Sequence, residues 1–173
     1  MAEDTAQHLA FLRLALEEAK KCIATPTAFC VGCVLTAAYP PGSQPVVVST
    51  GYSRELPGNT HAEANALAKF RALSETDLQK LIPSLPFGTS PLELLKTADC
   101  YTTMEPCSVR TSGLPPCADA LIEAGIRRCF IGVGEPDDFV ICEGAQKLRN
   151  AGVQVIWLKG LEKECLEEAR RGH

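Results

Sequence analysis

The chain has 173 residues, of which 46% are hydrophobic, and its formal net charge is −4 at pH 7. This length and apolar content are typical of one globular domain with a sizeable core, and they exclude an intrinsically disordered protein. The sequence has no basic stripe, and adjacent basic residues such as Lys20-Lys21 and Arg127-Arg128 form isolated pairs, which argues against a protein that binds long nucleic acids.

Membrane and secretory signals are not evident in the sequence. No stretch approaches the roughly 20 apolar residues of a membrane span. The chain starts with Met-Ala-Glu-Asp, which is acidic where a secretory or mitochondrial signal is basic. We therefore expect a cytoplasmic protein with no membrane partner. In that compartment, nine cysteines indicate metal binding or catalysis rather than disulfides.

The first half of the chain predicts a helix, a hairpin and a second helix. Asp4 or Thr5 is expected to cap the first helix, which apolar residues at helical spacing continue to about residue 19. The apolar runs 30–39 and 45–52 flank a Pro- and Gly-containing turn, so they predict a β-hairpin. The second helix is expected to run from Thr60 to about residue 73.

The second half of the chain alternates strands and helices. Residues 75–96 contain two short helical pieces between prolines and predict a surface insertion. The expected elements after it are strands at 98–104, 127–133 and 153–158, and helices at 117–125, 143–152 and 161–171. A strand, a helix and a strand in succession predict parallel pairing. The whole predicts one domain over residues 1–173, an α/β three-layer α/β/α sandwich with a central mixed sheet of about five strands.

A histidine and a glutamate stand two positions apart in the sequence NTHAE, residues 59–63. His61 is a possible metal ligand, and Glu63 beside it is a possible proton carrier. Thr60 and Glu63 also fit a capping box, in which each side chain binds the other residue's backbone N–H. This stretch alone leaves both the chemical and the structural interpretation open.

Two cysteines differ from the others because they lie in a polar loop rich in Pro and Gly. Cys107 directly follows a predicted strand, and Cys117 opens a predicted helix, where the partial positive charge favours a thiolate. His61, Cys107 and Cys117 make three ligands for zinc, and Cys100 belongs to a buried strand. Catalytic zinc uses three protein ligands and keeps one position open, so this number favours a catalytic site.

His-x-Glu followed by Pro-Cys and a later Cys resembles the zinc-dependent cytidine-deaminase-like superfamily. Nine residues separate Cys107 from Cys117, where Cys-x-x-Cys is common. This wider loop, with GYSRELPGNTHAE at 51–63 and TTMEPCSVRTSG at 102–113, is similar to the fungal riboflavin-pathway diaminopyrimidine deaminases. The resemblance extends from about residue 5 to residue 158 and is loose over 75–96.

The resemblance implies a hydrolytic deaminase. The expected reaction converts 2,5-diamino-6-ribitylamino-4(3H)-pyrimidinone 5′-phosphate to 5-amino-6-ribitylamino-2,4(1H,3H)-pyrimidinedione 5′-phosphate and ammonia. It implies one Zn²⁺ per chain at His61, Cys107 and Cys117, with Glu63 as the catalytic proton carrier. The partners would be this small phosphorylated substrate and a second copy of the chain in a homodimer, without nucleic acid.

Substrate contacts are expected from both motifs. Asn59 precedes the metal helix, although it also fits a turn, and the backbone carbonyl of Glu105 lies beside the zinc loop. The loop that follows is expected to meet the ring, the ribityl hydroxyls or the phosphate, or else to be a solvated surface loop; its polar residues and glycine are Ser108, Arg110, Thr111, Ser112 and Gly113. Arg54 is a second phosphate candidate, with an ordinary surface charge as its alternative.

Three other functions remain open from the sequence. A cytidine or deoxycytidylate deaminase and a tRNA adenosine deaminase share the metal chemistry, although the long cysteine loop and the lack of a basic stripe count against them. The third is a zinc-stabilised interaction module without turnover. Removal of zinc distinguishes this module from an enzyme because a structural site unfolds without its metal.

Overall fold

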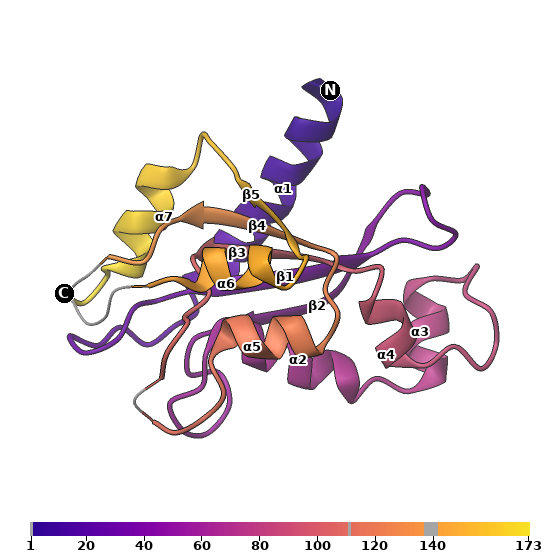
Figure 1. Ribbon diagram of the computed structural model, residues 1–173, viewed down its shortest axis with the longest axis horizontal. Coiled ribbons are helices and arrows are strands. Elements are labelled where there is room, and N and C mark those ends of the chain that lie inside the picture. The colour runs from indigo at the N-terminus through magenta and orange to yellow at the C-terminus, as the bar shows by residue number, and fades with distance from the viewer. Residues whose placement is uncertain (1, 111, 137–141) are drawn as a thin grey trace.

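A five-stranded sheet forms the centre of the computed structural model, which describes residues 2–110, 112–136 and 142–173 (Figure 1). The sheet order is β2-β1-β3-β4-β5. The strands are β1 (Gly32–Ala37), β2 (Val46–Tyr52), β3 (Asp99–Met104), β4 (Arg128–Val133) and β5 (Gln154–Trp157). β1 pairs antiparallel with β2 and β3, whereas β3, β4 and β5 run parallel. The predicted hairpin, parallel pair and mixed sheet are therefore confirmed.

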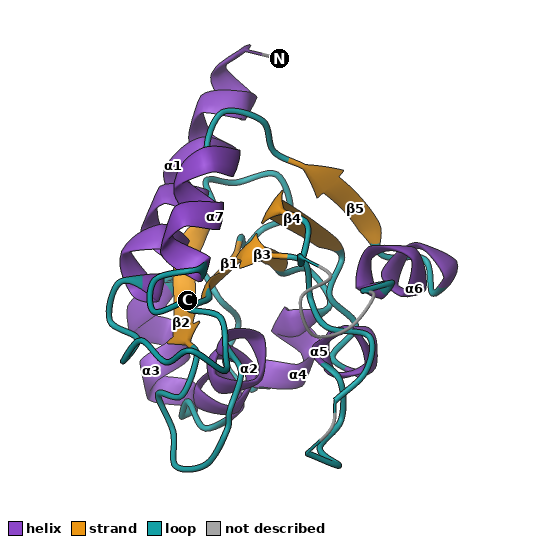
Figure 2. Cartoon of the chain, turned by 90° about the vertical axis from the view of Figure 1, so that its left-hand side faces the viewer, coloured by secondary structure: helices purple, strands orange, loops and turns teal. Residues whose placement is uncertain are grey.

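Helices cover both faces of this sheet, as the three-layer prediction requires (Figure 2). α1 (Ala2–Ala19) and α7 (Glu162–Ala169) pack on one face, and α2 (Ala62–Arg71), α5 (Cys117–Glu123) and α6 (Gly144–Asn150) cover the other. The predicted start of the first helix was wrong. α1 already begins at Ala2, which places Asp4 and Thr5 inside the helix, because Ala and Glu favour helix and nothing interrupts the run.

The core is divided by the sheet into two apolar layers. Tyr101 and Phe130 stack at 4.6 Å between their ring centroids on the α1 side, where Leu12 packs with them. Leu35 and Phe70 belong to the larger cluster on the α2 side. All six residues of β1 and of β3 are buried, so the two faces of these strands pack against both helical layers.

Glycines let two helices lie directly on the sheet. A Cβ atom at Gly32 would stand 1.9 Å from the carbonyl oxygen of Ala15 in α1. On the opposite face, a Cβ atom at Gly51 would stand 2.3 Å from the carbonyl oxygen of Ala62 in α2. Any larger residue at Gly51 would push the start of α2 away from the sheet, and this start is where His61 and Glu63 lie.

Residues 75–96 form α3 (Glu75–Leu81) and α4 (Pro91–Leu95), which confirms the two short helices. Each begins with a capping box, at Ser74 and at Ser90. This segment does more than cover the surface, because four of its leucines belong to the same apolar cluster as Phe70; they are Leu78, Leu85, Leu94 and Leu95. Its connecting loop carries Phe87, which is 85% exposed.

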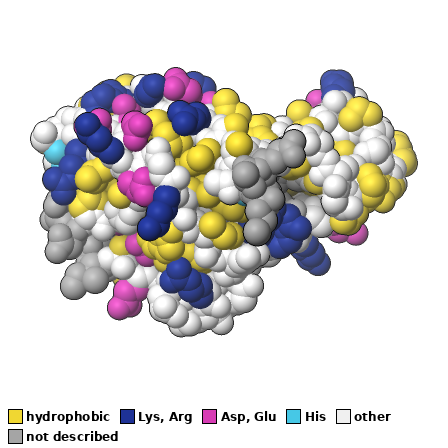
Figure 3. All heavy atoms as spheres, turned by 90° about the horizontal axis from the view of Figure 1, so that it is seen from above, with side chains coloured by type: hydrophobic (Ala, Val, Ile, Leu, Met, Phe, Trp, Pro, Cys, Tyr) yellow, Lys and Arg dark blue, Asp and Glu magenta, His cyan; other side chains and the backbone are white. Residues whose placement is uncertain are grey.

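The surface and the helices agree with the expectation of no basic stripe and no membrane span. On the face shown in Figure 3, Lys and Arg side chains are interspersed with Asp and Glu rather than gathered in one continuous basic surface. Within the described ranges, no helix combines the length and the apolar character that crossing a membrane requires.

Candidate metal centre

The residues expected to bind metal and to catalyse lie at one end of the strands of the sheet. The parallel strands β3 and β4 finish at this end, β2 also ends there, and β1 starts there. His61 is the N-cap residue of α2, Cys117 is the first residue of α5, and Cys107 lies in the loop after β3. The fold thus brings together two helix starts and a strand end from distant parts of the chain.

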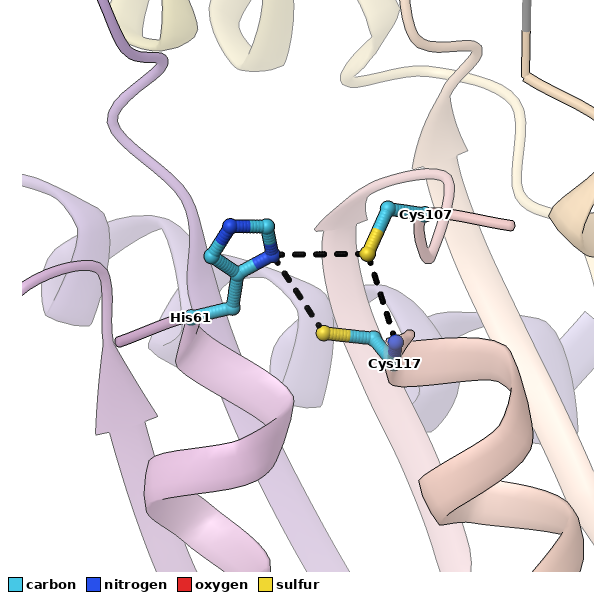
Figure 4. A group of neighbouring side chains, drawn as sticks. All are labelled: His61, Cys107 and Cys117. Atoms are coloured by element: carbon cyan, nitrogen blue, oxygen red, sulfur yellow. Dashed lines mark hydrogen bonds between the residues drawn. The ribbon is translucent and has the colours of Figure 1, made fainter. Parts of the chain in front are cut away.

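His61, Cys107 and Cys117 point toward one another with the geometry of a metal site (Figure 4). The Nδ1 atom of His61 lies 3.5 Å from Sγ of Cys107 and 3.4 Å from Sγ of Cys117. Tetrahedral zinc, with bonds of roughly 2.3 Å to sulfur and 2.1 Å to nitrogen, separates such ligand atoms by about 3.6 Å. The three side chains therefore fit one zinc ion, and they are the only such group of three among the described residues.

Cys107 and Cys117 shift each other's pKa in opposite directions. The backbone N–H of Cys117 donates to Sγ of Cys107 at 3.3 Å. The hydrogen bond from the Cys117 thiol lowers the pKa of Cys107 to about 4, while the same bond and burial raise the pKa of Cys117. The lowered pKa favours a thiolate at Cys107 beside His61, and binding of a divalent cation releases the thiol protons that remain.

Glu63 is buried next to the metal ligands, with 3% of its surface exposed. Burial raises the pKa of its carboxyl group, and the charge of Cys107 raises it further. The hydroxyl of Thr102, in β3, lies 3.0 Å from Oε1 of Glu63. A carboxyl group held near the metal with a raised pKa is suited to take up a proton and return it.

The capping box predicted at Thr60 was wrong. α2 begins one residue later than this motif requires, so His61 is the N-cap and no side chain caps the helix. Thr60 instead donates to the carbonyl oxygen of Leu56 at 3.0 Å and accepts from the amide of Asn65 at 3.0 Å. Because Glu63 is then at the second helical position rather than the third, its carboxyl group turns toward Thr102.

A cavity of about 360 Å³ opens in front of His61 and Glu63. Asn59, Glu105, Arg110 and Ser112, all predicted to contact substrate, line it. Ser108 does not line it, because its hydroxyl accepts a hydrogen bond from the backbone N–H of Glu143 at 3.1 Å. Thr111 lies outside the described residues.

Glu105 and Arg54 have structural partners that the sequence did not indicate. Oε1 of Glu105 accepts from the backbone N–H of Ala145 at 2.8 Å and ties the metal loop to α6. The role expected of the Glu105 carbonyl stays a prediction. Arg54 lines the cavity but is not a solvated surface charge, because its guanidinium donates to the carbonyl oxygens of Phe29 at 3.1 Å and Ile23 at 2.8 Å.

Glu135 also lines the cavity, and sequence reasoning missed it. It follows β4, and its Oε2 atom is buried without a hydrogen-bond partner among the described residues. Burial raises the pKa of its carboxyl group. Its position was a usable signal, because α/β folds place binding residues after the carboxyl ends of their parallel strands. An unpaired acceptor in a cavity is suited to a ligand that donates N–H groups.

Comparisons with known proteins agree with this geometry. Residues 5–133 match the family model described as the cytidine and deoxycytidylate deaminase zinc-binding region. The diaminohydroxyphosphoribosylamino-pyrimidine deaminase of Schizosaccharomyces pombe is 42% identical over 166 residues, which cover 96% of this chain and 36% of that protein. The RibD riboflavin biosynthesis protein of Actinobacillus pleuropneumoniae is 35% identical, over 78% of this chain and 27% of that protein.

A solved structure is also similar over almost its whole length. The Rib2 deaminase of Aspergillus oryzae, as a C-terminal deletion mutant, superposes with a TM-score of 0.75 at 34% identity, covering 96% of this chain and 92% of that one. The same mutant has been solved in complex with DARIPP. This chain spans about a third of the length of the two curated relatives named above.

Proposed function

Since this chain belongs to the cytidine and deoxycytidylate deaminase zinc-binding family, we propose that it is the hydrolytic deaminase of riboflavin biosynthesis. The proposed substrate is 2,5-diamino-6-ribitylamino-4(3H)-pyrimidinone 5′-phosphate, which loses its 2-amino group as ammonia. The observation that carries this proposal is the cluster of His61, Cys107 and Cys117 beside buried Glu63, at the wall of one cavity.

His61, Cys107 and Cys117 would hold one zinc ion per chain. Zinc bound by three protein ligands supplies Lewis-acid activation of a water molecule near neutral pH. Glu63 takes a proton from the attacking water and delivers it to a ring nitrogen, and it then carries the proton of the newly added hydroxyl group to the departing amine. The C–N bond breaks, a C=O bond forms, and one water is consumed for each ammonia released.

The substrate class is supported by the groups around the cavity. Its volume of about 360 Å³ is typical of small-molecule sites. Arg110 presents a planar guanidinium suited to a phosphate, and the unpaired Oε2 of Glu135 is suited to the amino and N–H groups of a diaminopyrimidine. The complex of the Aspergillus oryzae enzyme with DARIPP supports a small ligand of this kind.

Ammonia release from the diamino-ribitylamino-pyrimidinone phosphate tests the proposal, with Glu63→Gln as the matched variant. The wild-type protein should turn over, and the variant should lose about 10²–10⁴-fold in kcat because it cannot carry a proton. Zinc content should stay at one per chain in both. If zinc-loaded, folded protein deaminates deoxycytidylate instead, the proposed substrate is wrong and the proposed zinc-dependent reaction stands.

We also propose a cytoplasmic homodimer. All nine cysteines are free thiols, which supports a reducing compartment. Val109 and Leu114, on the loop between the two metal cysteines, are 58% and 48% exposed and offer apolar surface to a second copy. Light scattering after size-exclusion chromatography measures the mass in solution, and a monomer at micromolar concentration would refute the dimer.

A further inference from the structure

Thr102 occupies an unusual place beneath the candidate metal centre. It lies in β3 with no exposed surface. Its Oγ1 atom is 3.0 Å from Oε1 of Glu63 and 2.9 Å from the carbonyl oxygen of Met104. One hydroxyl therefore lies within hydrogen-bonding distance of both the proton-carrying carboxyl group and a backbone acceptor.

The surroundings give Glu63 few other polar groups on the sheet side. The thiols of Cys33 and Cys100 lie 3.6 Å apart in the same core layer, fully buried. Burial raises the pKa of Cys33, which favours its uncharged thiol, a weak hydrogen-bond donor. The backbone N–H of Glu63 itself and the side chain of Cys117 also interact with the Glu63 carboxyl group, and both come from helices rather than from the sheet. A hydrogen bond from the sheet side would fix the position of this carboxyl group, and the Thr102 hydroxyl is placed to donate it.

The hydroxyl of Thr102 has one hydrogen and two acceptor lone pairs. It donates to an ionised Glu63 in a charge-assisted hydrogen bond. The carbonyl oxygen of Met104, 2.9 Å from Oγ1, is a second acceptor that fixes the place of this hydroxyl. The hydroxyl is therefore placed to hold the carboxyl group in one position.

We propose that Thr102 is a positioning residue that fixes the Glu63 carboxyl group for proton transfer. The proposal rests on the deaminase function proposed above and deepens it. Thr102 is neither a residue of the metal cluster nor one that lines the cavity, so we expect its loss to lower kcat and to leave KM and the zinc content unchanged.

The test compares Thr102→Val, Thr102→Ser and Thr103→Val. Valine keeps the shape and removes the hydroxyl, and serine restores the hydroxyl. Thr103 is the matched control because its hydroxyl is equally buried on the opposite face of β3, where it accepts from the backbone N–H of Gly32 at 3.1 Å. We expect Thr102→Val to lose about tenfold to a hundredfold in kcat with KM within about twofold. Thr102→Ser and Thr103→Val should stay within about threefold of wild type.

Two results would overturn the proposal. One is an unchanged kcat in Thr102→Val, and the other is a loss in Thr102→Ser as large as in Thr102→Val. If valine prevents folding, Thr102→Ala compared with Thr102→Ser answers the same question. If wild-type protein does not deaminate the diaminopyrimidine, crystal structures of zinc-loaded wild type and Thr102→Val still decide. The Glu63 carboxyl group should move only in the variant, and an unmoved carboxyl group would refute the role of Thr102.

Discussion

The guanidinium group of Arg110 donates a hydrogen bond to the backbone carbonyl oxygen of Asn59, 51 residues earlier in the chain. This contact joins the loop that carries Cys107 to the loop that leads into His61. Both residues line the cavity, so the bond holds the two halves of the site together at its wall. The remaining N–H groups of Arg110 are suited to donate to a phosphate in the cavity.

Substitution of Arg110 by Gln should therefore weaken substrate binding more than it slows the reaction. We expect KM for the phosphorylated substrate to rise about tenfold to a hundredfold, which is the worth of a hydrogen bond to a charged group. The dephosphorylated substrate is the control, because its KM should be almost the same in variant and wild type. An equal rise for both substrates would show that Arg110 acts only by holding the loops together.

Removal of zinc by a chelator should abolish ammonia release and leave the fold intact. The ligands lie at the edge of the sheet, and the two apolar core layers do not depend on them. Far-UV circular dichroism should keep most of its helical signal, and added zinc should restore activity. Loss of the helical signal together with the metal would favour the zinc-stabilised module over the enzyme.

Glu135→Gln should change both turnover and the pH dependence of stability. Burial raises the folded-state pKa of Glu135 above its ordinary value of 4.5, so folding favours the protonated carboxyl group. This contribution is present below pH 4.5 and is lost as the pH rises through the raised value. Glutamine cannot ionise. The variant should therefore gain stability relative to wild type between mildly acidic and neutral pH, which urea unfolding of the metal-free proteins measures.

The same variant should also show whether the unpaired oxygen of Glu135 receives the substrate. We expect kcat/KM to fall roughly tenfold, because the carboxylate loses one acceptor and its charge. An unchanged kcat/KM would mean that Oε2 of Glu135 does not contact the substrate during turnover.

Gly144→Ala should disturb the metal centre indirectly, by displacing the loop that carries Cys107. A Cβ atom at Gly144 would lie 1.7 Å from the carbonyl oxygen of Pro106, which directly precedes Cys107. Because this neighbour is backbone, the loop must shift, and we expect zinc affinity to fall about tenfold to a hundredfold. Gly134→Ala is the control, since its nearest contact would be 3.9 Å. Equal zinc affinities in the two variants would contradict this prediction.

The metal centre was predictable from the sequence because its ligands carry local signals. His61 and Cys117 each open a helix, and Cys107 follows a strand. The strands, the hairpin and the layers also follow from apolar runs and turns that can be recognised within short windows. The capping box failed for a similar local reason, because a shift of one residue in the helix start moves Glu63 out of register with Thr60.

Contacts between distant segments were beyond prediction. The hydrogen bond from Thr102 to Glu63 spans 39 residues, and neither residue carries a signal of it. The unpaired oxygen of Glu135 is visible only once the walls of the cavity are in place. Arg54 is similar, because its partners Ile23 and Phe29 lie in an irregular segment before β1 whose path no sequence pattern specifies.

The chain order of the metal centre has a practical consequence for this protein. Residues 75–96 lie between its two halves and none of them lines the cavity. A backbone break beside exposed Phe87 would leave His61 and Glu63 on one fragment, and Cys107 and Cys117 on the other. Neither fragment alone carries the ligands for catalytic zinc. Ammonia release would then report that two fragments have associated, so the segment between α3 and α4 is a natural place to turn this chain into a two-component sensor.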